Sequence, residues 1–369
     1  MKKKKTETTG TPRPTIWDVA RHSGVSTATV SRVLNGQDYV AGETRDRVLS
    51  ALRELSYTHT RQPVLAAGGQ PELVGLTAMS MRLNEYTEII AGITEALHAR
   101  NGRPLICPIA WRHNCGMTLL ERLMYKSTVG GLILGSTDDE AELRAALQSG
   151  FPFVVIDPGA AVDEGIPVVA TSDWHGAKTA TEHLIALQHR RIAMITHQSN
   201  RFHSADRLAG FQSALMAAGL PLLPEAIYDG GEEDEKIAGY RAAHHFLALS
   251  EPPTAIIAVN DTIAVGVIQA ARERACPVPA MLSVVGFDDF DLARMITPEL
   301  TTMHQPFGEM GRVGVDMLYR LIEGRPLDAA RVELSARLVV RASSAPAPVE
   351  KYLASHHKPY PGEQNTNSG

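Results

Sequence analysis

Several short apolar runs in the chain are each followed by a polar residue that could bind a ligand. These residues are Ser80, Ser136, Asp157, Asn260 and Asp288. Ligands of open α/β sheets bind beyond the carboxyl ends of the strands, so these side chains would face one crevice. Hydroxyl, amide and carboxylate groups there suit a sugar or another polyol and require no catalysis. A structural alternative stays open, because Asn260 could simply cap a helix and Asp288 could simply form a turn.

Motifs typical of enzymes are missing from the sequence. It contains no phosphate-binding loop, no G-x-S-x-G elbow and no H-E-x-x-H, and GAKT at 176–179 lacks the upstream glycine of a phosphate loop. The pair His244-His245 falls on an expected helix, where adjacent side chains diverge by about 100° and make a poor metal site. We therefore predict no catalytic residue, no metal ligand and no cofactor, and a protein that is not an enzyme.

The elements that would position the polar residues alternate regularly beyond Pro71. Apolar runs typical of strands are LVGL, PLIC, GLILG, FVVID, IPVV, RIAMI, AIIAV and SVVGF. Amphipathic stretches such as EIIAGITEALHAR and KTATEHLIALQ lie between most of them. Continuous apolar strands that alternate with helices indicate parallel sheets covered on both faces. The length of this region favours two doubly wound lobes over one.

The N-terminal region has a different, helical pattern. Ile16, Val19 and Ala20 share one face of a short helix, and Gly24 ends it. Ser26 can cap a second helix, and a third fits Glu43 to Ser56. Two short helices around a glycine turn, followed by a supporting third, describe a helix-turn-helix unit that could enter a DNA major groove. A helical packing module without DNA is the structural alternative.

Charge and composition place further limits on the chain. Residues 1–69 carry 11 basic and 6 acidic residues, while the whole chain of 369 residues has a net charge of −5. A basic head on an acidic body suggests a polyanion-binding module, although the tail Lys2 to Lys5 supplies most of the excess. No apolar run is long enough for a membrane span, and neither a secretion signal nor a cysteine framework is present. We expect a cytoplasmic protein that contacts no membrane.

The head resembles a known DNA-binding unit. The stretches TIWDVARHSGVSTATVSRVLNG and YVAGETRDRVLSALRELSY resemble the headpiece of the lactose-repressor/galactose-repressor (LacI/GalR) family of bacterial transcription regulators. The resemblance implies that Thr27, Ala28 and Thr29 face operator bases at the start of a recognition helix. Ser31, Arg32, Thr15, Trp17, Asn35 and Tyr39 also match positions that contact DNA in this family, and the predicted DNA-binding set further includes Ser26 and Leu65.

The segment after the headpiece departs from this family. Members usually continue with Pro-Asn and a short hinge helix whose leucine enters the minor groove and kinks the DNA. Here His59-Thr60 stands in place of Pro-Asn, Pro63 falls within the expected helix, and Ala66 aligns with the intercalating leucine. Leu65, one residue earlier, could take that role. A flexible linker is the equally weighted alternative for 59–71.

The body resembles the regulatory core of the same family, which is related to periplasmic sugar-binding proteins. The resemblance is carried by VNDTIAVGVIQA, SVVGFDDFDLARMITPELTTMHQPF and DRLAGFQSAL. It places effector contacts at Asp157, Arg207, Asn260, Asp288 and Phe307, with Asn84 and Tyr86 as a partial match in which Glu85 replaces a proline. The implied ligand is a sugar or, because Arg207 could bind a carboxylate, a sugar acid.

These observations combine into one prediction of architecture and function. We expect a basic tail at 1–14, a helix-turn-helix domain at 15–58, a hinge or linker at 59–71, a core at 72–342 and a disordered tail at 343–369. One lobe would hold about 72–169 and 304–328, and the other about 170–303 and 329–342, including RVELSARLVVR as one strand. The protein would be a repressor of a pseudo-palindromic operator, controlled by a small polar effector between the lobes. It would act as a homodimer through a surface that includes EIIAGITEAL. The alternative is a non-regulatory sugar-binding or sugar-modifying protein with an accessory helical head.

Overall fold

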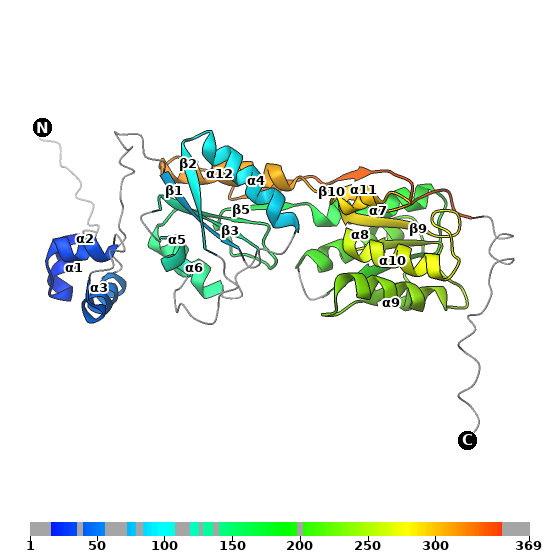
Figure 1. The fold of residues 1–369 in the computed structure, drawn as a ribbon, viewed down its shortest axis with the longest axis horizontal. Helices are drawn as coiled ribbons and strands as arrows, with labels where there is room; N and C mark the ends of the chain where they lie inside the picture. Colours follow the sequence, from blue (N-terminus) through cyan, green and yellow to red (C-terminus); the bar gives the residue numbers. More distant parts are fainter. Residues whose placement is uncertain are drawn as a thin grey trace, which may run out of the picture. The chain divides into compact units, whose positions relative to one another are not determined.

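The computed structural model describes residues 16–34, 40–55, 72–78, 84–107, 119–124, 128–135, 140–197 and 202–348. They form a helical headpiece and two α/β lobes (Figure 1). The first lobe comprises 72–156, Val162–Val168 and Gly311–Arg331, and the second comprises Asp157–Ala161, Val169–Met310 and the chain from Val332. None of the helices described is long and apolar enough to cross a membrane.

The headpiece consists of α1 (Ile16–Ser23), α2 (Thr27–Leu34) and α3 (Gly42–Glu54). Gly24 makes the turn between α1 and α2 with a φ of +68°, a conformation that glycine adopts without strain. The Ser26 hydroxyl caps α2 by accepting a hydrogen bond from the Thr29 amide at 3.1 Å. The buried apolar residues shared by the helices are Val19, Ala20, Val30, Val33, Val48 and Ala51. The predicted three-helix unit is therefore confirmed.

The first lobe is built on a six-stranded sheet with the order β11-β5-β4-β3-β1-β2. Its strands are β1 (Glu72–Ala78), β2 (Gly102–Ile106), β3 (Gly130–Leu134), β4 (Phe153–Ile156), β5 (Val168–Thr171) and β11 (Arg331–Leu334). Its helices are α4 (Asn84–His98), α5 (Leu119–Leu123), α6 (Glu140–Ser149) and α12 (Phe307–Ile322). Helices α4 and α12 pack closely at Gly311, where a Cβ would meet the backbone of Ile89.

The second lobe has another six-stranded sheet, with the order β12-β10-β9-β8-β6-β7. Its strands are β6 (Ile192–Thr196), β7 (Ile227–Asp229), β8 (Ala255–Ala258), β9 (Ser283–Asp288), β10 (Thr301–His304) and β12 (Arg337–Val339). Its helices are α7 (Asp173–Ala186), α8 (Phe202–Ala217), α9 (Glu235–Leu247), α10 (Asp261–Glu273) and α11 (Leu292–Met295), with a 3₁₀ turn at Pro224–Ala226.

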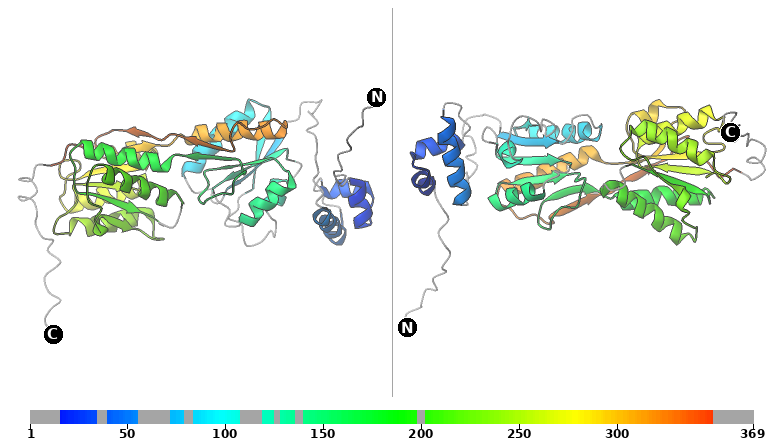
Figure 2. Two further views of the ribbon diagram at one scale, coloured as in Figure 1. Left: turned by 180° about the vertical axis from the view of Figure 1, so that it is seen from behind. Right: turned by 90° about the horizontal axis from the view of Figure 1, so that it is seen from below.

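Both faces of this second sheet carry helices (Figure 2). One apolar core joins α7 and α8 to the sheet through residues such as Leu184 and Phe211. The other joins α9 and α10 through residues such as Phe246 and Val267. Strands buried on both faces need continuous apolar sequence, which is the pattern that identified them. The prediction of two doubly wound lobes is confirmed.

The C-terminal part of the core differs from the prediction. We expected RVELSARLVVR to form one strand of the second lobe, but β11 joins the first sheet and β12 the second. Strand β12 pairs antiparallel with β10, whereas the pairs of β9 with β8 and β10 are parallel. Strands β7 and β10 lacked a predicted counterpart, because β7 has only three residues and β10 is rich in threonine.

The prediction placed the start of the disordered tail too early, because the structure describes the chain up to residue 348. Its Pro/Ser-rich composition suggested disorder from Ser343, yet this residue is fully buried. The Ser343 hydroxyl donates to the Val284 carbonyl at 2.6 Å and accepts from the Thr301 amide at 2.8 Å. Ala347 also donates its amide to Leu187 at 2.8 Å. A small serine that satisfies backbone groups fixes this segment, an effect that composition does not reveal. Residues 349–369 lie outside the described part.

Candidate functional site

Helix α2 presents a small, polar surface on the headpiece. Ala28 and Arg32 are exposed, and Thr27 and Thr29 are partly exposed. Hydroxyls, a methyl group and a guanidinium on one helix are suited to phosphates and base edges in a major groove. On α1, Trp17 is 68% exposed, which is unusual for so large an apolar side chain.

Packing holds α2 in place from both neighbouring helices. Val30 and Val33 are buried against α1 and α3, so the opposite face of α2 must point outward. His22 on α1 and Glu54 on α3 lie 2.5 Å apart and join those two helices at the surface. The headpiece thus offers a rigid helix for recognition rather than a mobile loop.

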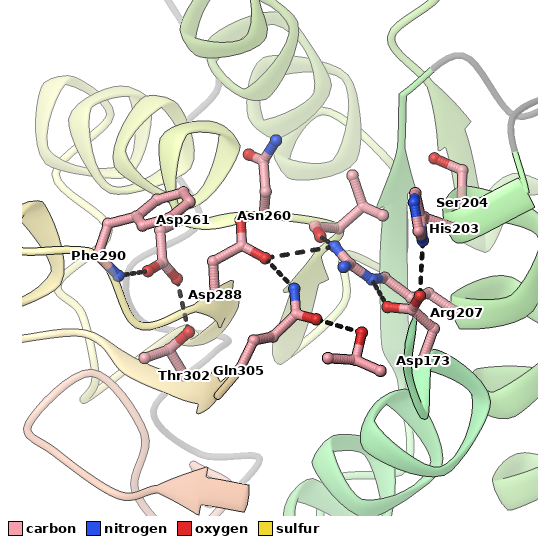
Figure 3. A network of polar contacts seen from close by, with 12 residues as sticks. Asp173, His203, Ser204, Arg207, Asn260, Asp261, Asp288, Phe290, Thr302 and Gln305 are labelled. Carbon is pink, nitrogen blue, oxygen red and sulfur yellow. Dashed lines mark hydrogen bonds and ion pairs between the residues drawn. The ribbon is translucent and has the colours of Figure 1, made fainter. Parts of the chain in front are cut away.

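A second polar feature lies inside the second lobe, at the carboxyl ends of its strands. Its centre is Arg207 on α8, which is only 7% exposed (Figure 3). Arg207 Nε donates to Asp173 Oδ1 at 2.6 Å, and Nη1 donates to the Val259 carbonyl at 2.5 Å. The guanidinium lies 3.8 Å from the centre of the Phe287 ring. These contacts satisfy a buried cation with an anion, a carbonyl and an aromatic face.

His203 precedes Arg207 by one helical turn and connects two carboxylates. Its Nδ1 donates to Asp173 Oδ2 at 2.8 Å, and its Nε2 lies 3.6 Å from Asp157 Oδ1. Burial alone would lower the pKa of His203, but the charge of Asp157, followed by the hydrogen bond that His203 donates to Asp173, raises this pKa to about 9. Burial opposes ionisation of Asp173 as well, yet the charge of Arg207 keeps its pKa below the usual value. His203 is therefore a cation at neutral pH.

Asp288 extends this network at the end of β9. Its Oδ1 lies 3.6 Å from Arg207 Nη1 and accepts a hydrogen bond from Gln305 Nε2 at 2.6 Å. Gln305 Oε1 in turn accepts from the Thr171 hydroxyl at 2.5 Å. We call Asp157, Asp173, His203, Arg207, Asp288 and Gln305 the polar network.

Two of these aspartates have unusual backbone conformations. The backbone φ angle is +57° at Asp157 and +111° at Asp288. Residues other than glycine rarely adopt positive φ angles. Both follow or end buried strands, where the chain turns sharply to leave the sheet. Strain of this kind collects at ligand-binding positions, because it aims a side chain in a direction that regular structure cannot.

Asn260 and Asp261 begin α10 beside the polar network. Asn260 caps the helix, because its Oδ1 accepts from the Ile263 amide at 2.9 Å. Asp261 accepts from the Thr302 hydroxyl at 2.6 Å and from the Phe290 amide at 2.9 Å. Burial raises the pKa of Asp261 to about 7 despite these two donors. Asn260 therefore does cap the helix, as the structural alternative predicted. The cap uses only its side-chain oxygen and does not use the Nδ2 group.

Aromatic side chains complete the surroundings. Phe307, predicted to line an effector pocket, is buried and stacks on Phe290 with ring centres 5.9 Å apart. Tyr86 on α4 is buried in the first lobe.

The structure unites part of the predicted effector set. Asp157, Arg207 and Asp288 share the polar network, and Asn260 directly follows Val259, which binds Arg207. Several other predicted residues cannot be placed. Outside the described residues lie Thr15, Asn35, Tyr39, Leu65, Ser80, Ser136 and the hinge 59–71. Ser31 and Asn84 are helical, but their side chains are outside the described part.

Sequence reasoning missed Asp173, His203 and Gln305. Asp173 lies two residues after β5, so the strand-end rule that selected Asp157 could have selected it, whereas Gln305 follows β10, a strand that the sequence did not reveal. His203 lies four residues before Arg207 on one helix, a spacing that brings side chains together. Among the described residues, no group of His, Cys, Asp and Glu side chains could hold a metal ion.

Known proteins match both parts of the chain. Residues 15–59 match "Bacterial regulatory proteins, lacI family", and residues 181–344 match "Periplasmic binding protein-like domain". The HTH-type transcriptional repressor PurR of Erwinia tasmaniensis is 34% identical over 340 residues, covering 92% of this chain and 99% of that protein. The chain belongs to the lacI family of bacterial regulatory proteins. It is a DNA-binding transcription regulator with a helix-turn-helix headpiece, and its relatives are repressors rather than enzymes.

Solved structures agree with this family membership. The transcriptional regulator CelR–cellobiose complex has a TM-score of 0.66 and 28% identity, with 90% of this chain and 100% of that chain covered. The lac repressor dimer bound to operator and the anti-inducer ONPF has a TM-score of 0.65, 28% identity and the same coverage. The predictions of a LacI-family regulator and of a protein that is not an enzyme are thereby confirmed, and the accessory-head alternative is set aside.

Proposed function

We propose that this regulator represses transcription from a pseudo-palindromic operator as a homodimer, and that a sugar or sugar acid controls its affinity for DNA. The supporting observation is the polar network. It brings together Asp157, Arg207 and Asp288, from segments far apart in sequence, at the carboxyl ends of strands. The positive φ values of Asp157 and Asp288 turn both side chains away from the regular direction of their strands, into this network.

The chemistry of the polar network fits a polyhydroxylated ligand. Carboxylate oxygens of Asp157 and Asp288 can accept hydrogen bonds from ligand hydroxyls, while Arg207 N–H groups and Asn260 Nδ2 can donate to them. Phe307 would supply an apolar face for the ring of a sugar. The cellobiose named in the CelR complex supports a sugar as the class of effector. Contributions from Ser80, Asn84, Tyr86 and Ser136 remain predictions.

The headpiece supplies the other half of the function. We propose Thr27, Ala28 and Thr29 as the base-reading residues, with Arg32 and Trp17 positioned for the backbone and groove walls. The remaining proposed DNA contacts are Thr15, Ser26, Ser31, Asn35, Tyr39 and Leu65. Such a regulator acts where the chromosome lies, in the bacterial cytoplasm. A helix-turn-helix domain at 15–58, a hinge or linker at 59–71 and an effector-binding core from residue 72 are part of this proposal.

Control requires that the effector discriminate between two states of the protein. A ligand that binds both states equally shifts nothing, so the polar network must differ between the operator-bound and the released form. The network spans α7, α8 and the ends of β4 and β9, and a ligand that draws on several of these segments can favour one arrangement of them.

Replacing Arg207 tests this proposal. In gel-shift assays with the full-length protein, neutral sugars and sugar acids are screened for an effect on operator binding. Arg207→Ala should retain operator binding but require about 10–100 times more of the active ligand, because it removes charged hydrogen bonds. Arg272→Ala, which removes an exposed arginine from α10, is the matched control and should respond like the wild type. An unchanged ligand response in Arg207→Ala would place the effector elsewhere.

A further inference from the structure

Each cation of the polar network is already paired with two carboxylates. Arg207 lies 2.6 Å from Asp173 and 3.6 Å from Asp288. His203 lies 2.8 Å from Asp173 and 3.6 Å from Asp157. The described network therefore holds three carboxylates and two cations.

We propose that the polar network selects an uncharged, polyhydroxylated effector over the corresponding carboxylate or phosphate, and that the ion pair of Asp157 and His203 sets this selectivity. This inference rests on the proposed function, because it concerns the same site and narrows the class of its ligand.

An anionic ligand needs a cation whose charge is not already neutralised. The Arg207 fork donates through Nε to Asp173 and through Nη1 to a backbone carbonyl, and one guanidinium face lies against Phe287. A ligand carboxylate would thus compete with Asp173 for Arg207 and be repelled by Asp288 and Asp157. A neutral hydroxyl avoids this repulsion, because it donates to a carboxylate and accepts from an N–H group.

Among the described residues of the second lobe, two further aspartates lie near the polar network, and neither brings an additional cation to it. Asp289 is buried and paired with Arg341, with His304 at 3.1 Å and with Arg294 at 3.6 Å. Those side chains contact a separate carboxylate. Asp261, also close by, accepts hydrogen bonds from Thr302 and Phe290 and adds no cation.

His203 matters because its positive charge offsets the negative charges of Asp157 and Asp173, which would otherwise act on a ligand. If Asp157 loses its charge, His203 remains a cation with one carboxylate partner fewer and can attract an anion. If His203 loses its charge instead, Asp157 and Asp173 repel an anion more strongly. Opposite changes in selectivity from these two substitutions would separate this mechanism from a general loss of binding.

Calorimetric titration of the full-length protein tests the inference. The ligands are the matched pairs glucose and glucuronate, galactose and galacturonate, and ribose and ribose 5-phosphate. For any pair that binds, we expect the neutral member to bind at least ~10-fold more tightly. Asp157→Asn should lower this preference by about tenfold or reverse it, and His203→Gln should increase it. Glu251→Gln removes an exposed negative charge from the same lobe and should leave the preference unchanged.

The outcomes separate this inference from the proposed function. An anionic member that binds as tightly as its neutral partner, with binding lost in Arg207→Ala, would overturn the inference and leave the effector site intact. Binding that survives Arg207→Ala, or no binding by any member of the three pairs, would count against the proposed function itself. A preference that neither Asp157→Asn nor His203→Gln alters would overturn the role of the ion pair, provided that thermal melts show both variants folded.

Discussion

At the scale of single residues, the polar network depends on charges that stabilise one another. Arg207 is buried and His203 is partly buried, and both cations contact the carboxylate of Asp173, which lies between them. The strand-end rule located Asp157, Asn260 and Asp288 from sequence, because their apolar strands are easily recognised. It could not show that Asp173 is the shared partner, since such a contact depends on how α7 and α8 pack.

The protonation of His203 leads to a pH-dependent stability. Its pKa is about 9 in the folded protein, compared with an ordinary value of 6.5. A raised pKa stabilises the fold fully below pH 6.5, and this contribution is lost as the pH rises through about 9. We expect the wild type to lose on the order of 1–3 kcal/mol more than His203→Gln between pH 6.5 and 9.5, measured by urea unfolding at each pH.

His245→Gln is the control for this measurement, because it removes an exposed imidazole from α9 of the same lobe. It should follow the wild-type pH profile. If His203→Gln followed that profile too, the imidazolium would contribute nothing to the stability of the fold. The stabilising role of its ion pairs would then be contradicted.

At the scale of elements, the sequence was informative wherever a strand is continuously apolar. Strands β3, β4, β6, β8 and β9 were all predicted, because each is buried on both faces. Strand β10 was missed although Thr301, Thr302 and Met303 are equally buried. Threonine appears polar in a sequence, but Thr302 satisfies its hydroxyl by donating to Asp261. Such partners come from distant segments and leave no local pattern.

The packing of α9 against α10 depends on two glycines. A Cβ on Gly239 would clash with the backbone of Ile263, and a Cβ on Gly266 would clash with the backbone of Lys236 and Tyr240. These helices can approach so closely only because neither glycine has a side chain. The distance between α9 and α10 is therefore set by the absence of a Cβ atom at each of these two glycines.

Gly266→Ala should force these helices apart. We expect the second lobe to lose about 1–3 kcal/mol of unfolding free energy, as overpacked cores do, measured by urea denaturation. Gly42→Ala is the control in the headpiece, because a Cβ at Gly42 would meet no atom within 4 Å. That substitution should be neutral or stabilise the headpiece by up to about 1 kcal/mol. Equal stability of wild type and Gly266→Ala would show that the helices can separate without cost.

At the scale of the whole molecule, we propose that DNA recognition combines one headpiece per chain with an assembly of chains. The relatives include a lac repressor dimer bound to operator, and we propose the same state for this protein. The sequence located the headpiece helices well, because a dense local motif encodes them. It could not identify the operator, because the proposed base-reading residues Thr27, Ala28 and Thr29 would contact bases only through a geometry shared with the DNA.

The proposed dimer can be tested by selecting the DNA sequences that the protein binds from a pool of random duplexes. The full-length protein should enrich a pseudo-palindrome, with one half-site for each headpiece. Thr27→Val should change the preferred base at one position of both half-sites, by about 1–3 kcal/mol, because it removes a base-reading hydroxyl. Trp17→Ala is the comparison and should weaken binding to all sequences similarly. An enriched site without symmetry, or a change in only one half-site, would contradict the dimer.

The discontinuity of the first lobe has a consequence for how the protein is made. Its last helix, α12, and its edge strand, β11, come from residues 307–334, after the chain has formed nearly all of the second lobe. A ribosome that has delivered residues up to 310 has therefore supplied an N-terminal sheet without its outer strand, and α4 without its partner α12. The second lobe can fold during synthesis from a mostly contiguous segment, while the first must wait with apolar surface uncovered. The part of the core that is synthesised first is therefore completed last.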